Sequence, residues 1–484
     1  MAYDEKCAGF LSAPVRNARH FRVSASLLLL LGAAARLPGQ DDSRTLLLRV
    51  SQTVMDTIER LPKYVCTQTI ERDRYEPDRR RFASFGGEHA RSCDEIVAES
   101  KSPSWKRRLS SSDRLRLDVA VNHSTPGVES EMYSWAGEGG FGDRSVFEVV
   151  RDGAVSTGSF ASLLASIFGS EGALFSYNGD STVDGRVLSE FGFRIPEEKS
   201  DYLYLFGRGR KQQTTIAYRG TFLVDPETAE LVRLSIRTSQ LPTETGACEL
   251  SQSLDYGRVS LNGSDFLLPT EARVSLIHTD ETEADNRIRY SACHEFRGEA
   301  TVRYEPAPAA VPPASREQSV RALALPRGLP FRLAFTERID TATAAAGDPI
   351  RAKLTTAIRD QSSKVLVPEG STVTGRIMSI RRFYPASRKQ TGDAREPKRQ
   401  YPPLELTVSL ETLEVDGVLH PFKAAFDARV QRFAKATGVL SRQVEIGSLD
   451  RLQDPDAGVF YFWDETPGYV VESGMESSWL TKAR

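Results

Sequence analysis

One β-hairpin constrains this chain more than any other stretch of its sequence. Two segments in which apolar and polar residues alternate flank the turn formed by Asp225, Pro226, Glu227 and Thr228. Proline presets the backbone angle of the first turn position, and the aspartate side chain can accept hydrogen bonds from the backbone that follows it. Alternation with a period of two is typical of a half-buried strand. Because more strand-like segments follow, we predict an antiparallel meander over residues 216–304.

The length and charge of the chain limit the possible domain count and partners. With 484 residues, the chain is longer than one hydrophobic core usually serves, so we expect two domains plus appendages. Its hydrophobic content of 40% is ordinary for a globular protein. The 63 basic and 65 acidic residues nearly cancel, leaving a net charge of −2. This balance gives no electrostatic reason to expect a nucleic-acid partner, and we expect none.

Residues 1–40 have the pattern of a secretory signal peptide behind an over-long N-terminus. A basic segment precedes a short apolar segment that runs from Val23 to Ala35. The apolar segment is too short to span a bilayer comfortably, so we expect no transmembrane helix once the signal is removed. A buried N-terminal helix is the alternative interpretation. Export implies a periplasmic or secreted protein, and association with the outer membrane stays open.

Cysteine usage agrees with export. Cys7 lies ahead of the signal segment, which leaves Cys66, Cys93, Cys248 and Cys293. Four cysteines allow three pairings, and nearness in sequence favours joining the first to the second and the third to the fourth. In an oxidising compartment each bond would stabilise the fold by about 2–4 kcal/mol. A zinc site is the rival interpretation, although the spacing lacks the C-x2-C pattern of such sites.

The region up to residue 304 combines two predicted helices with many strands. Asp42 and Ser43 are good N-cap residues, and the apolar residues behind them recur at helical spacing, so a helix is expected over residues 43–61. Ser159 can cap a second helix over residues 159–168. A charge-dense segment over residues 71–88 is predicted to be a solvated loop. Strands are predicted at residues 64–72, 115–121, 132–135, 174–177, 187–195, 202–206, 214–224, 231–238, 249–259, 266–277 and 288–304.

A proline-rich segment separates two predicted domains. Four prolines within residues 305–315 favour extended polyproline II, so residues 305–320 are predicted to be a linker between a first domain at 41–304 and a second at 321–484. The second domain is predicted to be a smaller β-barrel with a mobile basic loop at residues 382–403. Its clearest local signal is Asp416 followed by Gly417, a two-residue hairpin turn.

The helix leading into the strand at residues 64–72, the strand at 132–135, the apolar helix at 159–168 and the hairpin around Asp225 form a recognisable series. In these features the first domain resembles the LolA-like lipoprotein-carrier fold, which the sigma-factor regulator RseB shares. The resemblance implies a mainly β, or α+β, fold: a curved antiparallel half-barrel with helices packed into its concave side. It also implies a lipid or a lipoprotein segment as the ligand of that concavity.

The second domain carries another family likeness. Gly347, Asp348 and Pro349, followed by the segment from Val367 to Gly375, resemble the C-terminal β-barrel of TrbI-type proteins of conjugation and type IV secretion core complexes. In that family the barrel is structural. The resemblance therefore implies an assembly role and an envelope protein partner.

The sequence nominates no catalytic, cofactor-binding or metal-binding residue. Cys293 and His294 are neighbours in a predicted strand and point to opposite faces, so they cannot act together as nucleophile and base. The acidic residues around Asp280 lack the spacing of a calcium loop. We therefore expect an exported, non-enzymatic cell-envelope protein that needs no cofactor and binds an apolar ligand or a protein partner. A structural assembly role is the second hypothesis, and an unrecognised hydrolase is the third.

Overall fold

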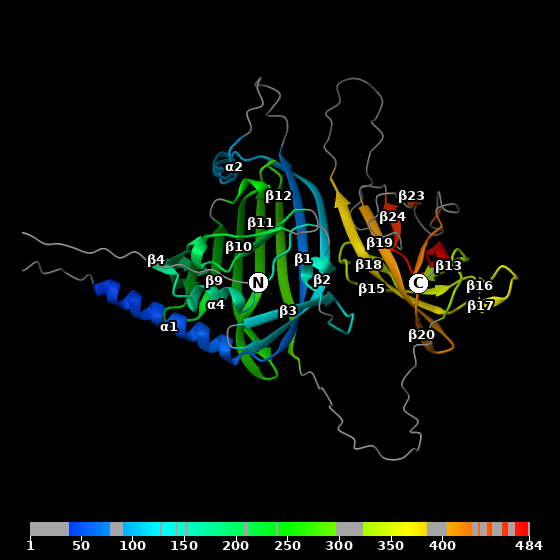
Figure 1. Cartoon of the computed structure of the whole chain (residues 1–484), viewed down its shortest axis with the longest axis horizontal. Coiled ribbons are helices and arrows are strands. Elements are labelled where there is room, and N and C mark those ends of the chain that lie inside the picture. The colour runs from blue at the N-terminus through cyan, green and yellow to red at the C-terminus, as the bar shows by residue number, and fades with distance from the viewer. Residues whose placement is uncertain are drawn as a thin grey trace, which may run out of the picture. The chain divides into compact units, whose positions relative to one another are not determined.

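The computed structural model of the chain describes residues 38–77, 91–125, 128–141, 144–150, 153–207, 212–238, 241–296, 323–384, 404–427, 434–435, 443–447, 457–462 and 470–482. The fold is mainly β, with antiparallel strands and few helices, as the sequence predicts (Figure 1). Residues 45–484 form one unit by their contacts. The apolar part of the predicted signal peptide and the predicted linker at 305–320 lie outside the described residues.

The N-terminal half is built on one antiparallel sheet. Its strands are β1 (Tyr64–Pro77), β2 (Arg107–Thr125), β3 (Val128–Trp135), β4 (Leu174–Val183), β5 (Arg186–Ile195), β8 (Tyr218–Val224), β9 (Leu231–Thr238), β10 (Ala247–Leu261), β11 (Ser264–His278) and β12 (Glu283–Glu295). They pair in the order β4–β5–β8–β9–β10–β11–β12–β1–β2–β3. A separate hairpin joins β6 (Leu203–Phe206) to β7 (Gln212–Thr215).

The hairpin at Asp225 is confirmed. β8 pairs with β9 across the turn, and the Asp225 carboxylate accepts hydrogen bonds from the backbone N–H of Glu227 at 2.9 Å and of Thr228 at 3.3 Å. The predicted strand over residues 214–224 is two strands, β7 and β8, because β7 turns back to pair with β6. Alternation of apolar and polar residues in the sequence cannot reveal where one strand ends and the next, which pairs with a different strand, begins.

The strands extend further into charged sequence than predicted. The first part of the expected loop at residues 71–88 belongs to β1, while residues 78–88 lie outside the described part of the chain. Charged side chains there pair across strands: Arg114 binds Glu71 at 3.0 Å, and Arg287 binds Asp73 at 2.7 Å. Opposite charges on neighbouring strands stabilise a sheet, so a charge-dense segment can be a strand.

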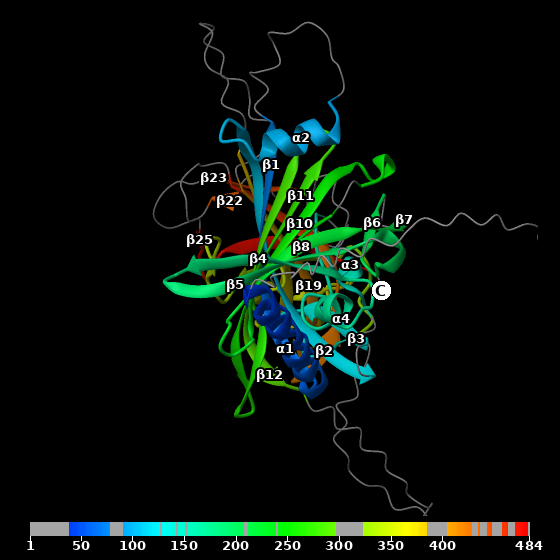
Figure 2. The ribbon, with the colours of Figure 1, turned by 90° about the vertical axis from the view of Figure 1, so that its left-hand side faces the viewer.

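Helices cover the concave side of this sheet. They are α1 (Pro38–Arg60), α3 (Val146–Val149) and α4 (Ser162–Phe168), whereas α2 (Cys93–Ser100) lies at the end of the strands (Figure 2). From α1, Val50, Val54 and Ile58 pack into the core at helical spacing. The expected start of α1 at residue 43 is wrong, because Pro38 suits the first turn of a helix, where its missing N–H costs nothing.

The cap predicted for the second helix is also wrong. The N-cap residue of α4 is Ala161, whereas Ser159 is buried and accepts a hydrogen bond from the Gln252 side chain at 3.3 Å. α2 and α3 were not predicted from the sequence, although capping boxes at Ser92 and Ser145 mark both starts. Among the described residues, no helix is long and apolar enough to cross a membrane.

The C-terminal half has its own antiparallel strands. They are β13 (Pro330–Phe335), β15 (Pro349–Leu354), β18 (Thr372–Phe383), β19 (Leu404–Val415), β20 (Val418–Pro421), β21 (Ala424–Phe426), β22 (Ala434–Lys435), β23 (Gln443–Gly447), β24 (Ala457–Phe462) and β26 (Glu476–Thr481). They pair in the order β21–β26–β13–β15–β18–β19–β24–β23–β22, with β20 also on β19. Two short ladders join β14 (Ile339–Asp340) to β25 (Val470–Val471), and β16 (Ile358–Arg359) to β17 (Val365–Val367).

A second hydrophobic core lies within these strands. Trp479 is fully buried, and its ring lies 4.3 Å from that of Phe426. The hairpin at Asp416 and Gly417 is confirmed, with both residues at positive φ, 51° and 78°. The predicted basic loop starts later than residue 382, because β18 continues to Phe383, and residues 385–403 lie outside the described part. The division into domains at residues 305–320 stays a prediction.

Candidate ligand cavity

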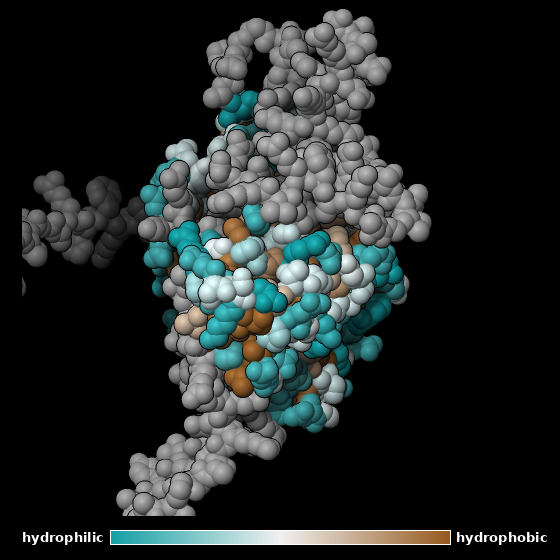
Figure 3. All heavy atoms as spheres, turned by 90° about the vertical axis from the view of Figure 1, so that its right-hand side faces the viewer, coloured by the Kyte–Doolittle hydropathy of each residue, from teal (hydrophilic) through white to brown (hydrophobic). Residues whose placement is uncertain are grey.

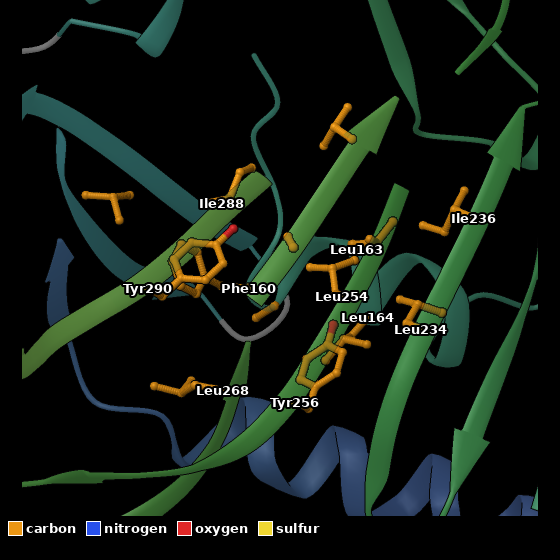
Figure 4. Packing of buried hydrophobic residues seen from close by; sticks show 14 of the residues in the cluster. Phe160, Leu163, Leu164, Leu234, Ile236, Leu254, Tyr256, Leu268, Ile288 and Tyr290 are labelled. Atoms are coloured by element: carbon orange, nitrogen blue, oxygen red, sulfur yellow. The ribbon is translucent and has the colours of Figure 1, made fainter. Parts of the chain in front are cut away.

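The concave face of the N-terminal sheet is organised in cross-strand rows. One row is entirely apolar and buried, and it crosses seven neighbouring strands: Leu115, Ile70, Ile288, Ala272, Leu254, Leu234 and Phe222. Figure 4 shows Ile288, Leu254 and Leu234 of this row together with the α4 residues Leu163 and Leu164. Apolar contact between α4 and the sheet closes this part of the core, so it leaves no room for a ligand.

The next two rows line a cavity of about 1110 Å³. Across β2, β1, β12, β11 and β10, one row is Asp113, Arg72, Asn286, Val274 and Gln252, and the other is Ser111, Arg74, Ala284, Leu276 and Leu250. The floor therefore changes from charged and polar at β2 and β1 to mainly apolar at β11 and β10. The volume of the cavity slightly exceeds the range of roughly 300–1,000 Å³ that is typical of ligand pockets.

The opposite wall is formed by β6, α3, α4 and the segment at residues 153–158. The Tyr202 ring lies 5.3 Å from that of Tyr218, and burial raises the pKa of the Tyr202 hydroxyl above its ordinary value. A hydrogen bond of 3.0 Å from the Ile216 N–H to the Tyr202 carbonyl holds the start of the β6 hairpin. Leu203 beside it is 50% exposed, so the apolar wall reaches the surface.

A polar chain crosses the middle of the cavity. The Tyr202 hydroxyl donates to the side-chain oxygen Oε1 of Gln252 at 3.4 Å, and the side-chain Nε2 of Gln252 donates to the Ser159 hydroxyl at 3.3 Å. The Ser156 hydroxyl also lines the cavity, is buried, and has no hydrogen-bond partner among the described residues. A buried hydroxyl without a partner is costly, which makes this group available to a ligand.

The charged end contains three arginines, Arg72, Arg74 and Arg381, and the last of these lies 4.0 Å from the Asp113 carboxylate. Arg72 is buried and binds both carboxylate oxygens of Asp113, at 2.6 and 2.7 Å. Arg74, two residues on, is exposed at the rim, and its guanidinium makes no hydrogen bond or ion pair within the described residues. His278 lies at the same end, and burial lowers the pKa of its imidazole, with the Arg74 charge adding to the effect. Arg74 also acts at a distance on Asp280, because its positive charge lowers the pKa of that carboxyl.

The four predicted site cysteines form two disulfides, but the pairing favoured by nearness in sequence is wrong. The bonds join Cys66 to Cys293 and Cys93 to Cys248. Cys248 of β10 lies beside Ile277 of β11, and Ile277 pairs with Glu283 at the start of β12. Cys293 lies ten residues further along β12. That is about 33 Å of extended strand, so these two cysteines cannot meet.

Pairing between β1 and β12 explains the first bond. Val65 lies opposite His294 and Thr67 opposite Ser291, which sets Cys66 beside Cys293. In the second bond, Cys93 starts α2, which packs over the start of β10 with Ile96 and Ile277. Among the described residues, no group of three or more His, Cys, Asp or Glu side chains is placed to hold a metal ion.

Two of the solved structures that this chain matches are weak likenesses. A DUF1329 family protein from Desulfovibrio piger matches with a TM-score of 0.24 and 10% identity, over 53% of this chain and 94% of that one. A putative outer membrane lipoprotein-sorting protein domain from Vibrio parahaemolyticus matches with a TM-score of 0.23 and 9% identity, over 51% and 92%. Likenesses this weak carry no argument about function.

The sequence comparisons find nothing. No protein-family model matches the chain, and no curated protein does. The likeness of the C-terminal half to TrbI-type barrels is not confirmed.

Proposed function

We propose that the N-terminal half of this protein is a non-enzymatic binding domain for an amphipathic lipid or the acyl part of a lipoprotein. The observation that carries the proposal is the cavity of about 1110 Å³ whose floor is apolar on one side and charged on the other. A ligand with an apolar chain and one anionic group matches both sides. Its chain would lie along Leu250, Val274 and Leu276, and its anionic group would bind Arg74.

The charge pattern favours an anion at the rim over one deeper in the cavity. Asp113 already satisfies Arg72 through two hydrogen bonds, so a buried anion at that point would have to displace it. Arg74 makes no direct hydrogen bond or ion pair to a carboxylate within the described residues, and its charge acts only at a distance on Asp280. Ser156 and Gln252 would donate to polar groups further along the chain of the ligand.

We also propose that the protein is exported to the periplasm. The support is the signal-like N-terminal sequence, together with two disulfides that use all four cysteines behind it. Stable disulfides form in oxidising compartments. The same compartment holds lipoproteins and lipids in transit, which fits the proposed ligand class.

A lipid-binding assay on the full chain tests the function. We expect lipid to co-purify with the protein, as detected by native mass spectrometry. We also expect a fluorescent fatty acid to bind to the protein and to be displaced by that lipid. Ala284→Trp would fill the cavity floor. Displacing about two methylene groups of ligand costs roughly 1.6 kcal/mol, so affinity should fall by more than about tenfold.

Ser253→Trp is the matched control. Ser253 lies on β10 next to Gln252 but points to the opposite face of the sheet and does not line the cavity. Ser253→Trp adds the same side chain to the same sheet, but on the face away from the cavity. It should therefore leave the affinity for the fatty acid unchanged. Equal affinity in both variants, or no bound lipid in the wild-type protein, would remove the proposal.

A further inference from the structure

Three arginines lie side by side on the outer face of the N-terminal sheet, the face opposite the cavity. Antiparallel pairing sets Arg194 of β5 directly opposite Arg219 of β8, and Arg219 directly opposite Arg237 of β9. All three residues are exposed, whereas the strand neighbours Phe193 and Ile236 are buried in the core on the other face. We call Arg194, Arg219 and Arg237 the arginine row.

The arginine row has no carboxylate partner. None of its three guanidinium groups makes a hydrogen bond or ion pair with another residue in the part of the chain that the structure describes. The residue facing Arg237 on the next strand is Ser251, which carries no charge. Elsewhere on this face arginines are matched: Arg233 of β9, for example, pairs with Asp255 of β10.

An unmatched row of this kind lowers the stability of the sheet. Side chains directly opposite each other on neighbouring strands have Cβ atoms about 5 Å apart, and like charges in such pairs are destabilising. Adjacent strands are about 4.8 Å apart, so the row spans roughly 10 Å. An anionic surface that contacts the whole row would remove the repulsion.

An exposed apolar side chain continues the row. Leu174 of β4 lies directly opposite Arg194 and is 67% exposed. β4 is the strand at this end of the pairing order, and it forms an outlying hairpin with β5 (Figure 2). Cations next to an exposed leucine match the interface of a bilayer, where headgroup phosphates meet acyl chains. A soluble polyanion would use the arginines but would gain nothing from Leu174.

We propose that the arginine row and Leu174 dock this protein on the surface of an anionic phospholipid bilayer. The proposal does not depend on what the cavity binds, because the row and the cavity lie on opposite faces of the sheet. In the view of Figure 3, the described residues of the C-terminal half show apolar areas among hydrophilic ones.

Co-sedimentation of the full chain with lipid vesicles tests the proposal. We expect binding to vesicles that contain phosphatidylglycerol, weaker binding as salt is added, and none to pure phosphatidylcholine. Each arginine near an anionic surface is worth about fivefold in affinity, so Arg219→Gln should lose about fivefold and the triple glutamine variant about a hundredfold. Leu174→Ser should also weaken binding.

Arg233→Gln is the matched control, since it removes an exposed but paired arginine from the neighbouring strand β9 on the same face, and it should bind as the wild type does. Thermal unfolding separates docking from folding: Arg219→Gln removes like-charge repulsion, so its midpoint should not fall. Vesicle binding that survives in the triple variant would overturn the proposal. So would binding to heparin without binding to vesicles, or displacement from vesicles by inorganic phosphate but not by chloride at equal ionic strength.

Discussion

Gly220 illustrates how closely β8, β9 and β5 pack. A Cβ atom on Gly220 would lie 1.9 Å from the backbone oxygen of Ser235 and 2.7 Å from the Phe193 ring. The backbone oxygen belongs to the paired strand and cannot rotate away. Glycine is therefore required here by the space between strands rather than by an unusual backbone angle.

Gly220→Ala should lower the free energy of unfolding by about 1–3 kcal/mol, the usual cost of overpacking. Urea denaturation followed by tryptophan fluorescence measures it. Gly140→Ala is the control, because a Cβ at Gly140 meets nothing within 4 Å. If both variants unfold at the same urea concentration, the packing between these strands is looser than described.

His278 gives the fold a pH dependence. Burial lowers the pKa of its imidazole in the folded state, although the nearby Asp280 opposes the shift. The unfolded chain then binds more protons than the folded one just below the ordinary histidine pKa of about 6.5, so stability rises with pH in that window. The contribution is present above the unfolded pKa and is lost as the pH falls through the folded pKa.

Replacing the imidazole should remove this dependence. We expect the difference in unfolding free energy between the wild type and His278→Gln to shrink as the pH falls from neutral to about 5. Denaturant titrations at several pH values measure the difference. A gap that stays constant over that range would mean that His278 titrates alike in both states.

At the scale of elements, the disulfides join parts of the chain that are far apart in sequence. The Cys93–Cys248 bond spans 155 residues and ties α2 to the start of β10, where Ile96, Cys248 and Ile277 of β11 form a small core of their own. The Cys66–Cys293 bond spans 227 residues and joins β1 to β12. Each therefore restricts a large part of the unfolded chain.

Peptide mapping without reductant should recover Cys66 linked to Cys293 and Cys93 linked to Cys248. The double variant Cys93→Ala/Cys248→Ala should lose about 2–5 kcal/mol of unfolding free energy, because the bond that restrains the unfolded chain is gone. Peptides that link Cys66 to Cys93 would restore the pairing favoured by nearness in sequence.

At the scale of the whole molecule, buried side chains form two separate hydrophobic cores. The first gathers residues from α1 to β12, almost entirely ahead of the predicted linker, and the second gathers residues from 329 to 479. The predicted linker at 305–320 lies between them in sequence.

We expect limited proteolysis to cut near residues 305–320 and to leave two fragments that resist further digestion. A proline-rich segment between two cores is the usual position of such a cut. Mass spectrometry of the fragments gives the position. Cleavage that instead begins inside β18 or β19 would mean that the two halves do not form separate domains.

Local patterns in the sequence were enough to predict the mainly β fold, the hairpins at Asp225 and Asp416, and the use of four cysteines in disulfides. Each of these depends on residues close together in the chain, where turn chemistry and alternation act. The end of β1 at residues 73–77 was missed because its charges are compensated by partners on other strands.

Register is what the sequence alone could not determine. It sets Cys66 beside Cys293, places Arg72, Arg74 and Asn286 at one end of the cavity, and aligns three arginines on the outer face. A shift of one residue would move every one of these side chains to the other face. Pairing between strands far apart in sequence, such as β1 and β12, depends on the whole core, so only the tertiary structure decided where the cavity lies.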